Sequence, residues 1–278
     1  MSASQLKLEK VGEREYRFMY PRFITHFDDL IYDASDLIDV EEYVEAKSIL
    51  HTIIDAFPEH IEAHHYLALC MDYQGEEQVA FHLWEKAVEI GMAYFPKGES
   101  ATSMQLNWEW LENRPFLEAY EGLGMAYYNQ DDTDEAIKIF THLLALNPAD
   151  HQGIRGRAIQ AYFESGKPGA VLDICELYPE DGIADTLYGR LLALFQLKRK
   201  HNVEGMLKRT IECLPFIAKE IVRPHHTELD IVLESEVFDE EKIEALDYWE
   251  NFGHYWLETS GAIELLRRGL TRYHKESS

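Results

Sequence analysis

The chain has 278 residues, of which 46% are hydrophobic, enough apolar material for one elongated domain or two compact ones. Asp and Glu number 51 against 26 Lys and Arg, so the formal net charge is −25. A field of this sign repels phosphate backbones and anionic lipid headgroups, which makes nucleic acids and membrane surfaces poor partners. It favours basic proteins or peptides, although acidity also serves solubility alone.

The N-terminus, the apolar runs and the cysteines indicate the compartment. MSASQLKLEK lacks the apolar core of a signal peptide, and the longest dense apolar run, LLALF at 191–195, is far shorter than the roughly 20 residues of a membrane span. Cys70, Cys175 and Cys213 form no CxxC motif, and each lies in an apolar-rich helical stretch. We therefore expect three buried, reduced thiols and a cytoplasmic protein.

The first residues do not follow a helical period. QLKLEKVGEREYRFMY, residues 5–20, carries Tyr16, Phe18 and Tyr20 in alternation, which predicts a short strand or an extended arm. We expect residues 1–26 to form this N-terminal arm and to lie along the first helices that follow.

The clearest pattern is a 34-residue unit at 117–150. Two sets of apolar or small residues recur at helical spacing, separated by the polar break NQDDTD, and the unit ends at a proline. These residues are Tyr120, Leu123, Gly124, Tyr127, Ala136, Phe140, Leu143 and Pro148. The unit therefore predicts two amphipathic helices whose close crossing requires small residues such as Gly124 and Ala136.

The same pattern recurs along the chain. It is found at 27–60 and 61–94, in a shorter form at 151–181, and in a weaker form at 182–215, where KRKHN replaces the expected small residue. Several repeats in register are a specific signal, because helical pairs must stack to bury a continuous core.

The unit resembles the tetratricopeptide repeat (TPR) family at the residues quoted above, except that Leu143 stands where the family usually has Ala. The resemblance implies an all-α fold, a right-handed helical-repeat superhelix of about five helix pairs over 27–215. Residues 216–278 would supply an acidic segment, at 228–247, and C-terminal capping helices. We expect Trp249 and Trp256 to dock on the fifth repeat.

Enzymatic and metal chemistry have little support. His60 and His64 lie four apart in HIEAHH, but the HExxH order and a third ligand are missing. The chain has no GxSxG elbow and no glycine-rich phosphate loop. We expect no catalytic residue, no cofactor and no metal site, and hence no enzyme.

The resemblance also implies where a partner would bind, because the first helix of each repeat lines a concave groove in the family. Carried over position by position, the groove residues are Glu62, His65, Leu69, Asp72, Tyr73, Glu118, Glu121, Met125, Tyr128, Asn129, Arg155 and Tyr162. This mixed acidic and apolar set suits a peptide that carries basic residues between apolar anchors. The Lys, Asn and Arg with which one subclass binds a terminal carboxylate are absent. Their positions hold Ile31, Ser35, Tyr66, Glu118 and Gly122.

An insertion, residues 95–116, separates the second and third repeats and contains LNWEWLENRPF. MQLNWEWLEN can form a short helix that Pro115 interrupts. We expect Leu106, Trp108, Trp110 and Leu111 to be buried as a wedge between the repeats. Asn113 and Arg114 would satisfy helix-end carbonyls. Two interpretations stay open: a purely structural wedge, or one that also shapes the groove wall.

Three functions follow, in order of preference. The first is a non-enzymatic scaffold or adaptor that binds a basic and apolar peptide segment in the groove. The second is a self-assembling structural protein, in which the acidic segment pairs with a basic cluster of a neighbouring copy, although we favour pairing within one chain. The third is an enzyme with a site near 95–116. The basic cluster comprises Lys198, Arg199, Lys200, Lys208 and Arg209.

Overall fold

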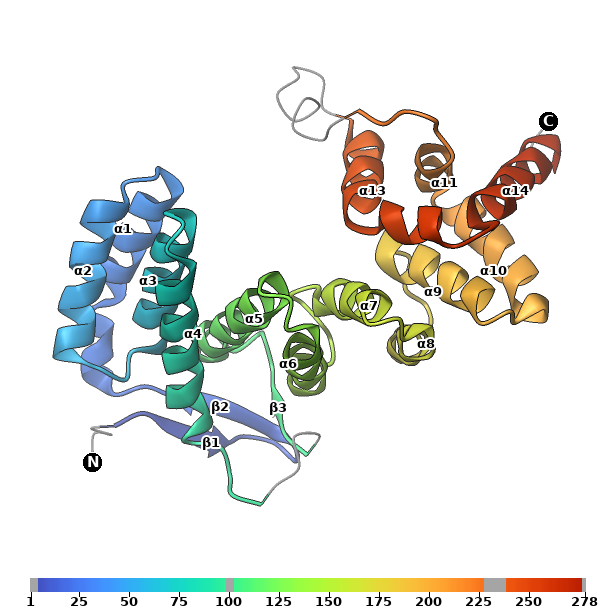
Figure 1. Ribbon diagram of the computed structural model, residues 1–278. Coiled ribbons are helices and arrows are strands. Elements are labelled where there is room, and N and C mark those ends of the chain that lie inside the picture. The colour runs from blue at the N-terminus through green and yellow to red at the C-terminus, as the bar shows by residue number, and fades with distance from the viewer. Residues whose placement is uncertain (1–4, 99–102, 228–238, 277–278) are drawn as a thin grey trace. The chain divides into compact units, whose positions relative to one another are not determined.

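The computed structural model describes residues 5–98, 103–227 and 239–276. The chain forms two compact units, unit 1 (Met1–Ile154) and unit 2 (Arg155–Ser278), built almost entirely from helices (Figure 1). The predicted all-α helical-repeat fold is confirmed. No helix in the described part of the chain is both long and apolar enough to cross a membrane. The division into arm, repeats and capping segment stays a prediction.

The helices follow one another as hairpin pairs whose positions agree with the predicted repeats. Unit 1 contains α1 (Asp28–Asp39) with α2 (Tyr43–Ala56), α3 (Ile61–Tyr73) with α4 (Glu77–Met92), and α5 (Arg114–Asn129) with α6 (Thr133–Leu146). Unit 2 contains α8 (Pro168–Leu177), α9 (Ala184–Gln196) and α10 (Lys200–Cys213), and α7 (Ile154–Glu164) begins at the boundary of the two units. The weak fifth repeat therefore still forms both of its helices.

Each pair turns in the same way. One residue of the turn has a positive φ, and the residue after it donates its backbone N–H to the carbonyl five positions earlier, which is the Schellman ending of a helix. The left-handed residues are Glu41, Gly75, Asp131, Gly166 and Lys198. Glycine occupies this position at no steric cost in two turns, and the other three turns hold side chains there against the usual preference.

Small residues allow the two helices of a pair to approach, as predicted. A Cβ atom at Gly124 would lie 2.7 Å from Cε1 of Phe140 on the facing helix. Ala46, Ala80 and Ala136 are fully buried at equivalent positions of the second helices. A larger side chain at any of these positions would push the pair apart.

The N-terminal residues form a hairpin rather than a single arm. β1 (Lys7–Lys10) pairs antiparallel with β2 (Glu15–Met19), and β3 (Gln105–Leu106) of the insertion pairs parallel with β2 (Figure 1). η1 (Arg22–His26) follows, and the ring of its Phe23 packs against the ring of Phe57, with 5.3 Å between the ring centroids. The prediction that the arm lies along the first helices was thus incomplete, because the hairpin packs mainly on the insertion.

Aromatic rings join the hairpin to the helices. Phe18 of β2 lies 5.4 Å from the fully buried Phe116 of α5, and Phe95, where the insertion begins, lies 5.3 Å from the same ring. Phe116 also contacts Gly91 of α4, where a Cβ atom would collide with the ring. The insertion therefore begins and ends at one aromatic cluster.

The C-terminal helices only partly follow the prediction. α11 (Pro215–Ile221) packs on α13 (Glu240–Glu258), and α14 (Ala262–Glu276) packs on α10. Trp256 is fully buried 6.2 Å from Tyr188 of α9, so it docks on the fifth repeat as expected. Trp249 is half-buried, and its ring stacks on His226 at 3.6 Å, so its docking on the fifth repeat stays a prediction.

The three cysteines are all free thiols. Cys70 and Cys175 are buried, and burial raises their pKa values to about 11 and about 12. Cys213 is exposed, which corrects the prediction of three buried thiols. It is the last residue of α10, and its side chain faces away from the apolar face of that helix.

Candidate functional site

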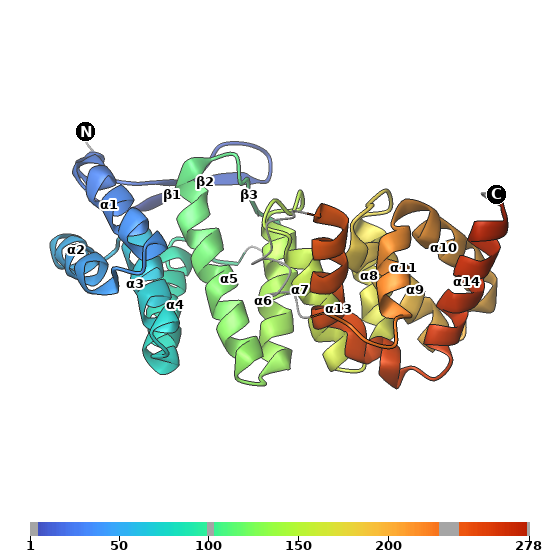
Figure 2. The ribbon, with the colours of Figure 1, turned by 90° about the horizontal axis from the view of Figure 1, so that it is seen from above.

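The first helices of the three pairs in unit 1 lie next to one another. α3 packs directly on α1 and on α5 (Figure 2). We call the surface that these three helices share the first-helix face of unit 1. Ten of the twelve predicted groove residues lie on α3 and α5.

Carboxylates from all three helices converge on this face. Burial, with Glu118 and Asp28 as like-charged neighbours, raises the pKa of Glu62 to about 7. Burial also raises the pKa of Glu118, although Arg114 nearby opposes the shift. At neutral pH the cluster therefore carries negative charge that its own surroundings do not fully stabilise.

Two tyrosines border this acidic cluster. Burial, and to a smaller extent the charge of Glu62, raises the pKa of Tyr66 to about 12, while its hydrogen bond with Ser35 lowers that pKa. The pKa of Tyr20 is raised by burial and by Glu62 and Glu112, and its buried hydroxyl has no hydrogen-bond partner among the described residues. In the sequence, Tyr20 alternates with Tyr16 and Phe18, which was a signal that the three share one face of a strand, but its place beside the acidic cluster was not predicted.

His65 points into the protein interior and does not contribute to the first-helix face of unit 1. It is 7% exposed, and its Nδ1 accepts a hydrogen bond from Nε1 of Trp84 on α4 at 3.2 Å. Burial lowers the pKa of His65 to about 4, so it is neutral at physiological pH. Trp84 also explains Gly122, because a Cβ atom there would lie 2.5 Å from the same indole nitrogen. Gly122, one of the five positions that correspond to the carboxylate-binding residues of one subclass, thus has no room for a side chain.

The other predicted groove residues of unit 1 differ in exposure. Tyr73 is 59% exposed with its ring 6.0 Å from Tyr43. Glu121 accepts a hydrogen bond from Nε2 of Gln152 at 2.8 Å. Asn129 is exposed, and the remaining four are half-buried: Leu69, Asp72, Met125 and Tyr128. The face therefore offers apolar and aromatic contact area beside the carboxylates.

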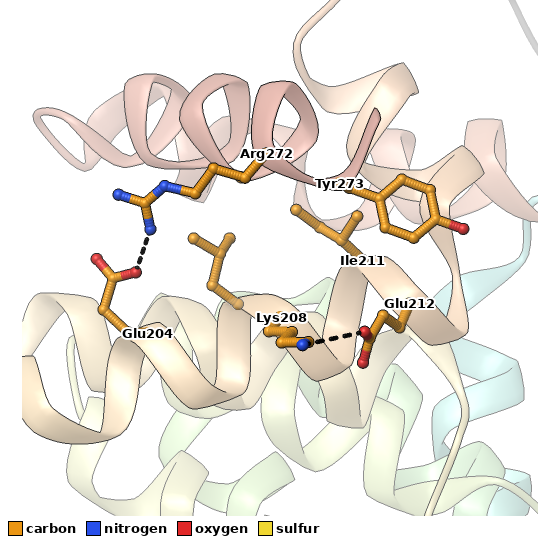
Figure 3. A pocket seen from close by; sticks show the side chains of 8 residues that line it. Glu204, Lys208, Ile211, Glu212, Arg272 and Tyr273 are labelled. Atoms are coloured by element: carbon orange, nitrogen blue, oxygen red, sulfur yellow. Dashed lines mark hydrogen bonds and ion pairs between the residues drawn. The ribbon is translucent and has the colours of Figure 1, made fainter. Parts of the chain in front are cut away.

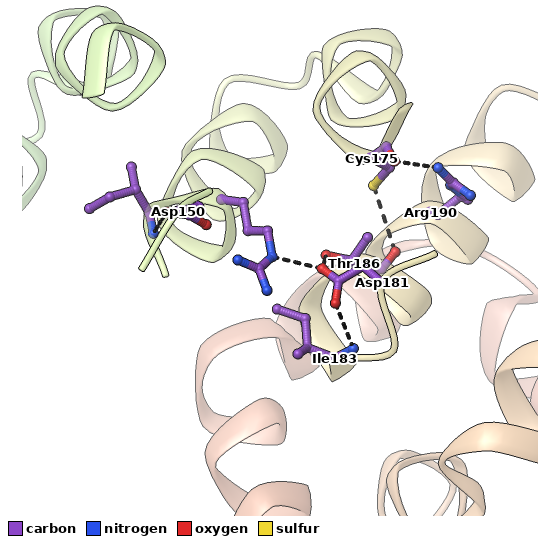
Figure 4. Close-up of polar contacts among 8 residues, drawn as sticks. Asp150, Cys175, Asp181, Ile183, Thr186 and Arg190 are labelled. Atoms are coloured by element: carbon purple, nitrogen blue, oxygen red, sulfur yellow. Dashed lines mark hydrogen bonds and ion pairs between the residues drawn. The ribbon is translucent and has the colours of Figure 1, made fainter. Parts of the chain in front are cut away.

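Arg155 and Tyr162 belong to unit 2, and Arg155 is committed to an internal ion pair. Its Nε lies 2.7 Å from Oδ2 of Asp181, which also accepts a hydrogen bond from Thr186 at 2.8 Å (Figure 4). Burial alone would raise the pKa of Asp181, but the hydrogen bonds from Arg155, Thr186 and Ile183 outweigh it and lower that pKa. Tyr162 is half-buried on α7.

Helix α13 covers the corresponding face of unit 2. The ring of Tyr255 on α13 stacks on Phe163 of α7 at 5.2 Å, and its hydroxyl donates to Oε2 of Glu164 at 2.8 Å. On α9, Tyr188 lies 5.5 Å from Tyr248 of α13. The first helices of the fourth and fifth repeats are thus covered by the chain itself.

In the insertion, Asn113 of η2 (Leu111–Asn113) is a buried polar residue. It is fully buried, its Oδ1 accepts from the backbone N–H of Phe18 at 3.0 Å, and its Nδ2 donates to the carbonyls of Tyr16 and Asn107, both at 3.1 Å. The side chain of Asn113 therefore forms the backbone hydrogen bonds that a neighbouring strand would otherwise form with this part of β2.

The tryptophans of the insertion are less buried than predicted. Trp110 is 36% exposed beneath Arg17, whose Cζ lies 4.4 Å from its ring, and Leu111 is 65% exposed. Trp108 is half-buried under the guanidinium of Arg114, whose Nε donates to the Trp108 carbonyl at 3.0 Å. Leu106 is fully buried, as predicted, whereas the prediction of buried Trp110 and Leu111 was wrong. Residues 105–106 extend the sheet, so in MQLNWEWLEN a helix forms only at Leu111–Asn113. Asn113 and Arg114 donate to carbonyls of strand and turn residues and not to the predicted helix-end carbonyls.

The histidine pair has structural partners. Nδ1 of His60 accepts the N–H of Ala63 at 3.2 Å at the start of α3, and Nε2 of His64 lies 3.0 Å from the carbonyl of Pro58. Within the described ranges, no three His, Cys, Asp or Glu side chains gather closely enough to hold a metal ion.

Comparison with known protein families gives a match over one repeat. Residues 117–150 match the family model described as tetratricopeptide repeat. The unit at 117–150 is therefore a tetratricopeptide repeat. No curated protein matches the sequence significantly.

Several solved structures are similar to this chain. YrrB, described as a TPR protein with an unusual peptide-binding site, is 16% identical over 70% of this chain and 93% of its own, with a TM-score of 0.50. A putative kinesin light chain with nearly identical TPR-like repeats from Podosopora anserina is 14% identical over 68% and 95%, with a TM-score of 0.49. MamA is 17% identical over 64% and 92%, with a TM-score of 0.48. The likeness to YrrB shows the fold alone.

Proposed function

We propose that the protein is a non-enzymatic scaffold or adaptor, and that the first-helix face of unit 1 binds a partner segment with basic residues between apolar ones. The observation that supports this most is the acidic cluster of Glu62, Glu118 and Asp28, in which Glu62 has a pKa of about 7. Burying carboxylates beside one another costs stability, and such arrangements gather at functional sites.

A cationic side chain of the partner would remove this cost. A Lys or Arg placed between Glu62 and Glu118 forms charge-assisted hydrogen bonds and favours the ionised carboxylates. The half-buried Leu69, Met125 and Tyr128 would supply apolar contact area next to the charges. The partner is therefore a protein segment of basic and apolar character.

The proposal assigns binding to unit 1. In unit 2, α13 occupies the face of α7 and α9 through Tyr255, Tyr248 and the fully buried Trp256. Displacing it would expose these rings to water, at a cost of roughly 1.5–3 kcal/mol for each. A partner segment gains more by binding the uncovered face of unit 1.

A selection of random peptides on the immobilised full-length protein tests the proposal. We expect enrichment of Lys or Arg flanked by Leu, Phe, Tyr or Trp. Enrichment of acidic peptides, or no enrichment, would contradict it. In isothermal titration calorimetry, the Glu62→Gln/Glu118→Gln variant should bind a selected peptide at least about tenfold more weakly, the equivalent of about 1.4 kcal/mol.

A charge-matched control separates the cluster from the overall field of the protein. Asp36→Asn/Asp55→Asn removes two exposed charges from α1 and α2 of the same unit and should change the affinity by less than about twofold. Binding should also weaken as the pH falls from 8 to 5. The reason is that Glu62, whose pKa is about 7, becomes protonated over this range and loses the charge that attracts the cation.

A further inference from the structure

A second feature of the molecule lies in unit 2, away from the first-helix face of unit 1. A pocket of about 500 Å³ is lined by the turn between α9 and α10 and by the residues where α14 begins after α13. Three basic side chains line it: Lys198, Lys200 and Arg268. This is the volume range in which proteins hold small ligands.

The three cations have no ion-pair partner among the described residues, although the chain has almost two acidic residues for each basic one. Among the described residues, Glu204 is the acidic residue that lines the pocket, and its Oε2 lies 2.7 Å from Nη1 of Arg272 (Figure 3). The carboxylate is thus committed to another cation.

The neighbouring pocket between α10 and α14 provides a contrast. It has a volume of about 180 Å³, and its charges are paired within it, Glu204 with Arg272 at 2.7 Å and Lys208 with Glu212 at 3.7 Å (Figure 3). The two positive charges of this smaller pocket are therefore neutralised by carboxylates that line the same pocket. The larger pocket therefore differs from its neighbour by an excess of positive charge.

Helix ends add to this charge. Lys200 is the first residue of α10, whose N-terminus has no side-chain hydrogen bond to cap it. Thr259 and Ser260, just before α14, line the same pocket. The N-terminus of a helix carries partial positive charge and free N–H groups, which favour anions.

The floor of the pocket is apolar. Val203 and Leu265 are 6% and 2% exposed, and Phe195 is half-buried beside them. Gln196 is held by a hydrogen bond to Thr259 at 2.9 Å, so the polar groups of the wall are ordered. A ligand that fills this space has an anionic group against the cations and an apolar body on the floor.

We propose that this pocket binds a small phosphate ester whose apolar or aromatic body rests on Phe195, Val203 and Leu265 while Lys198, Lys200 and Arg268 hold the phosphate. Three cations suit a dianion better than a single carboxylate, because each adds attraction to the second charge. The proposal does not depend on peptide binding by unit 1.

Titrations of the full-length protein followed by nuclear magnetic resonance test the proposal with three probes: phenyl phosphate, inorganic phosphate and benzyl alcohol. Phenyl phosphate should bind saturably and shift the amide signals of residues 195–203 and 259–268. Inorganic phosphate should bind more weakly, and benzyl alcohol should not saturate. No saturation with phenyl phosphate, or equal binding of benzyl alcohol, would overturn the proposal.

Matched variants complete the experiment. Lys198→Gln/Lys200→Gln/Arg268→Gln should weaken phenyl phosphate binding by at least about tenfold, since three exposed charge contacts are lost. Lys208→Gln/Lys219→Gln/Lys275→Gln removes as many positive charges from unit 2 outside this pocket and should leave binding within about twofold of the wild type. Equal losses in both variants would show that only overall charge matters. If the first variant fails to fold by circular dichroism, the single Lys198→Gln and Lys208→Gln variants make the same comparison.

Discussion

At the scale of single residues, Glu62 is the most informative position. Its carboxylate costs the folded state stability, because burial and two acidic neighbours raise its pKa from 4.5 to about 7. A raised acid pKa means that the folded state holds a proton that the unfolded state releases, so stability falls as the pH rises from 4.5 to 7. A residue that weakens the fold in this way is better explained by binding than by packing.

The variant Glu62→Gln tests this cost. It should resemble the wild type at about pH 3, where the carboxyl is protonated in both states, and should be more stable above pH 7 by on the order of 2 kcal/mol. Urea unfolding at the two pH values measures the difference, with Asp36→Asn as an exposed control. A stability gain that is equal at both pH values would contradict the account.

Gly122 illustrates a second residue-scale effect. Gly122→Ala would place a methyl group 2.5 Å from the Trp84 indole nitrogen and should destabilise the protein by about 1–3 kcal/mol while shifting tryptophan fluorescence. Gly169→Ala, in α8, meets no atom within 4 Å and should be neutral or stabilising by up to about 1 kcal/mol. If the two variants unfold at the same urea concentration, the close contact is not real.

At the scale of elements, the insertion acts mainly through its backbone. Asn113 completes the hydrogen bonds of β2, and β3 adds two residues to the sheet. Trp108 and Trp110 instead shield this junction from outside, each under an arginine. The tryptophans that drew attention in the sequence therefore contribute less than the asparagine beside them.

Asn113→Ala should lower the free energy of unfolding by about 2–4 kcal/mol, because it leaves the buried N–H of Phe18 without its acceptor and removes the hydrogen bonds from Nδ2 to the carbonyls of Tyr16 and Asn107. Trp110→Ala should cost less than about 1.5 kcal/mol, since the ring is 36% exposed. Thermal and urea unfolding measure the loss of stability in both variants. A larger loss for Trp110→Ala would restore the prediction of a buried tryptophan wedge.

The elements that were predictable from sequence are those with local causes. The apolar spacing and the turn residues Glu41, Gly75 and Asp131 determine where the helices begin and end. The pairing of residues 105–106 with β2 was not predictable, because it joins segments far apart in the chain through only two residues. The acidic positions Glu62 and Glu118 came from the family resemblance, whereas their shared burial required the structure.

At the scale of the whole molecule, one repeat architecture is used in two ways. In unit 1 the first-helix face carries half-buried carboxylates and apolar groups and is free of further helices in the described residues. In unit 2 the same face is covered by α13, whose nineteen residues include the fully buried Trp256. Covering helices cannot be read from the repeat period, because α13 lies outside the repeats and its docking is non-local.

Hydrogen exchange of the full-length protein with and without a selected basic and apolar peptide tests the central proposal most directly. The account predicts new protection in α1, α3 and α5, little change in α7, α9 and α13, and loss of the protection in Glu62→Gln/Glu118→Gln. Protection that appears on α7 and α9 together with faster exchange in α13 would contradict it, because the peptide would then have displaced the chain's own helix from unit 2.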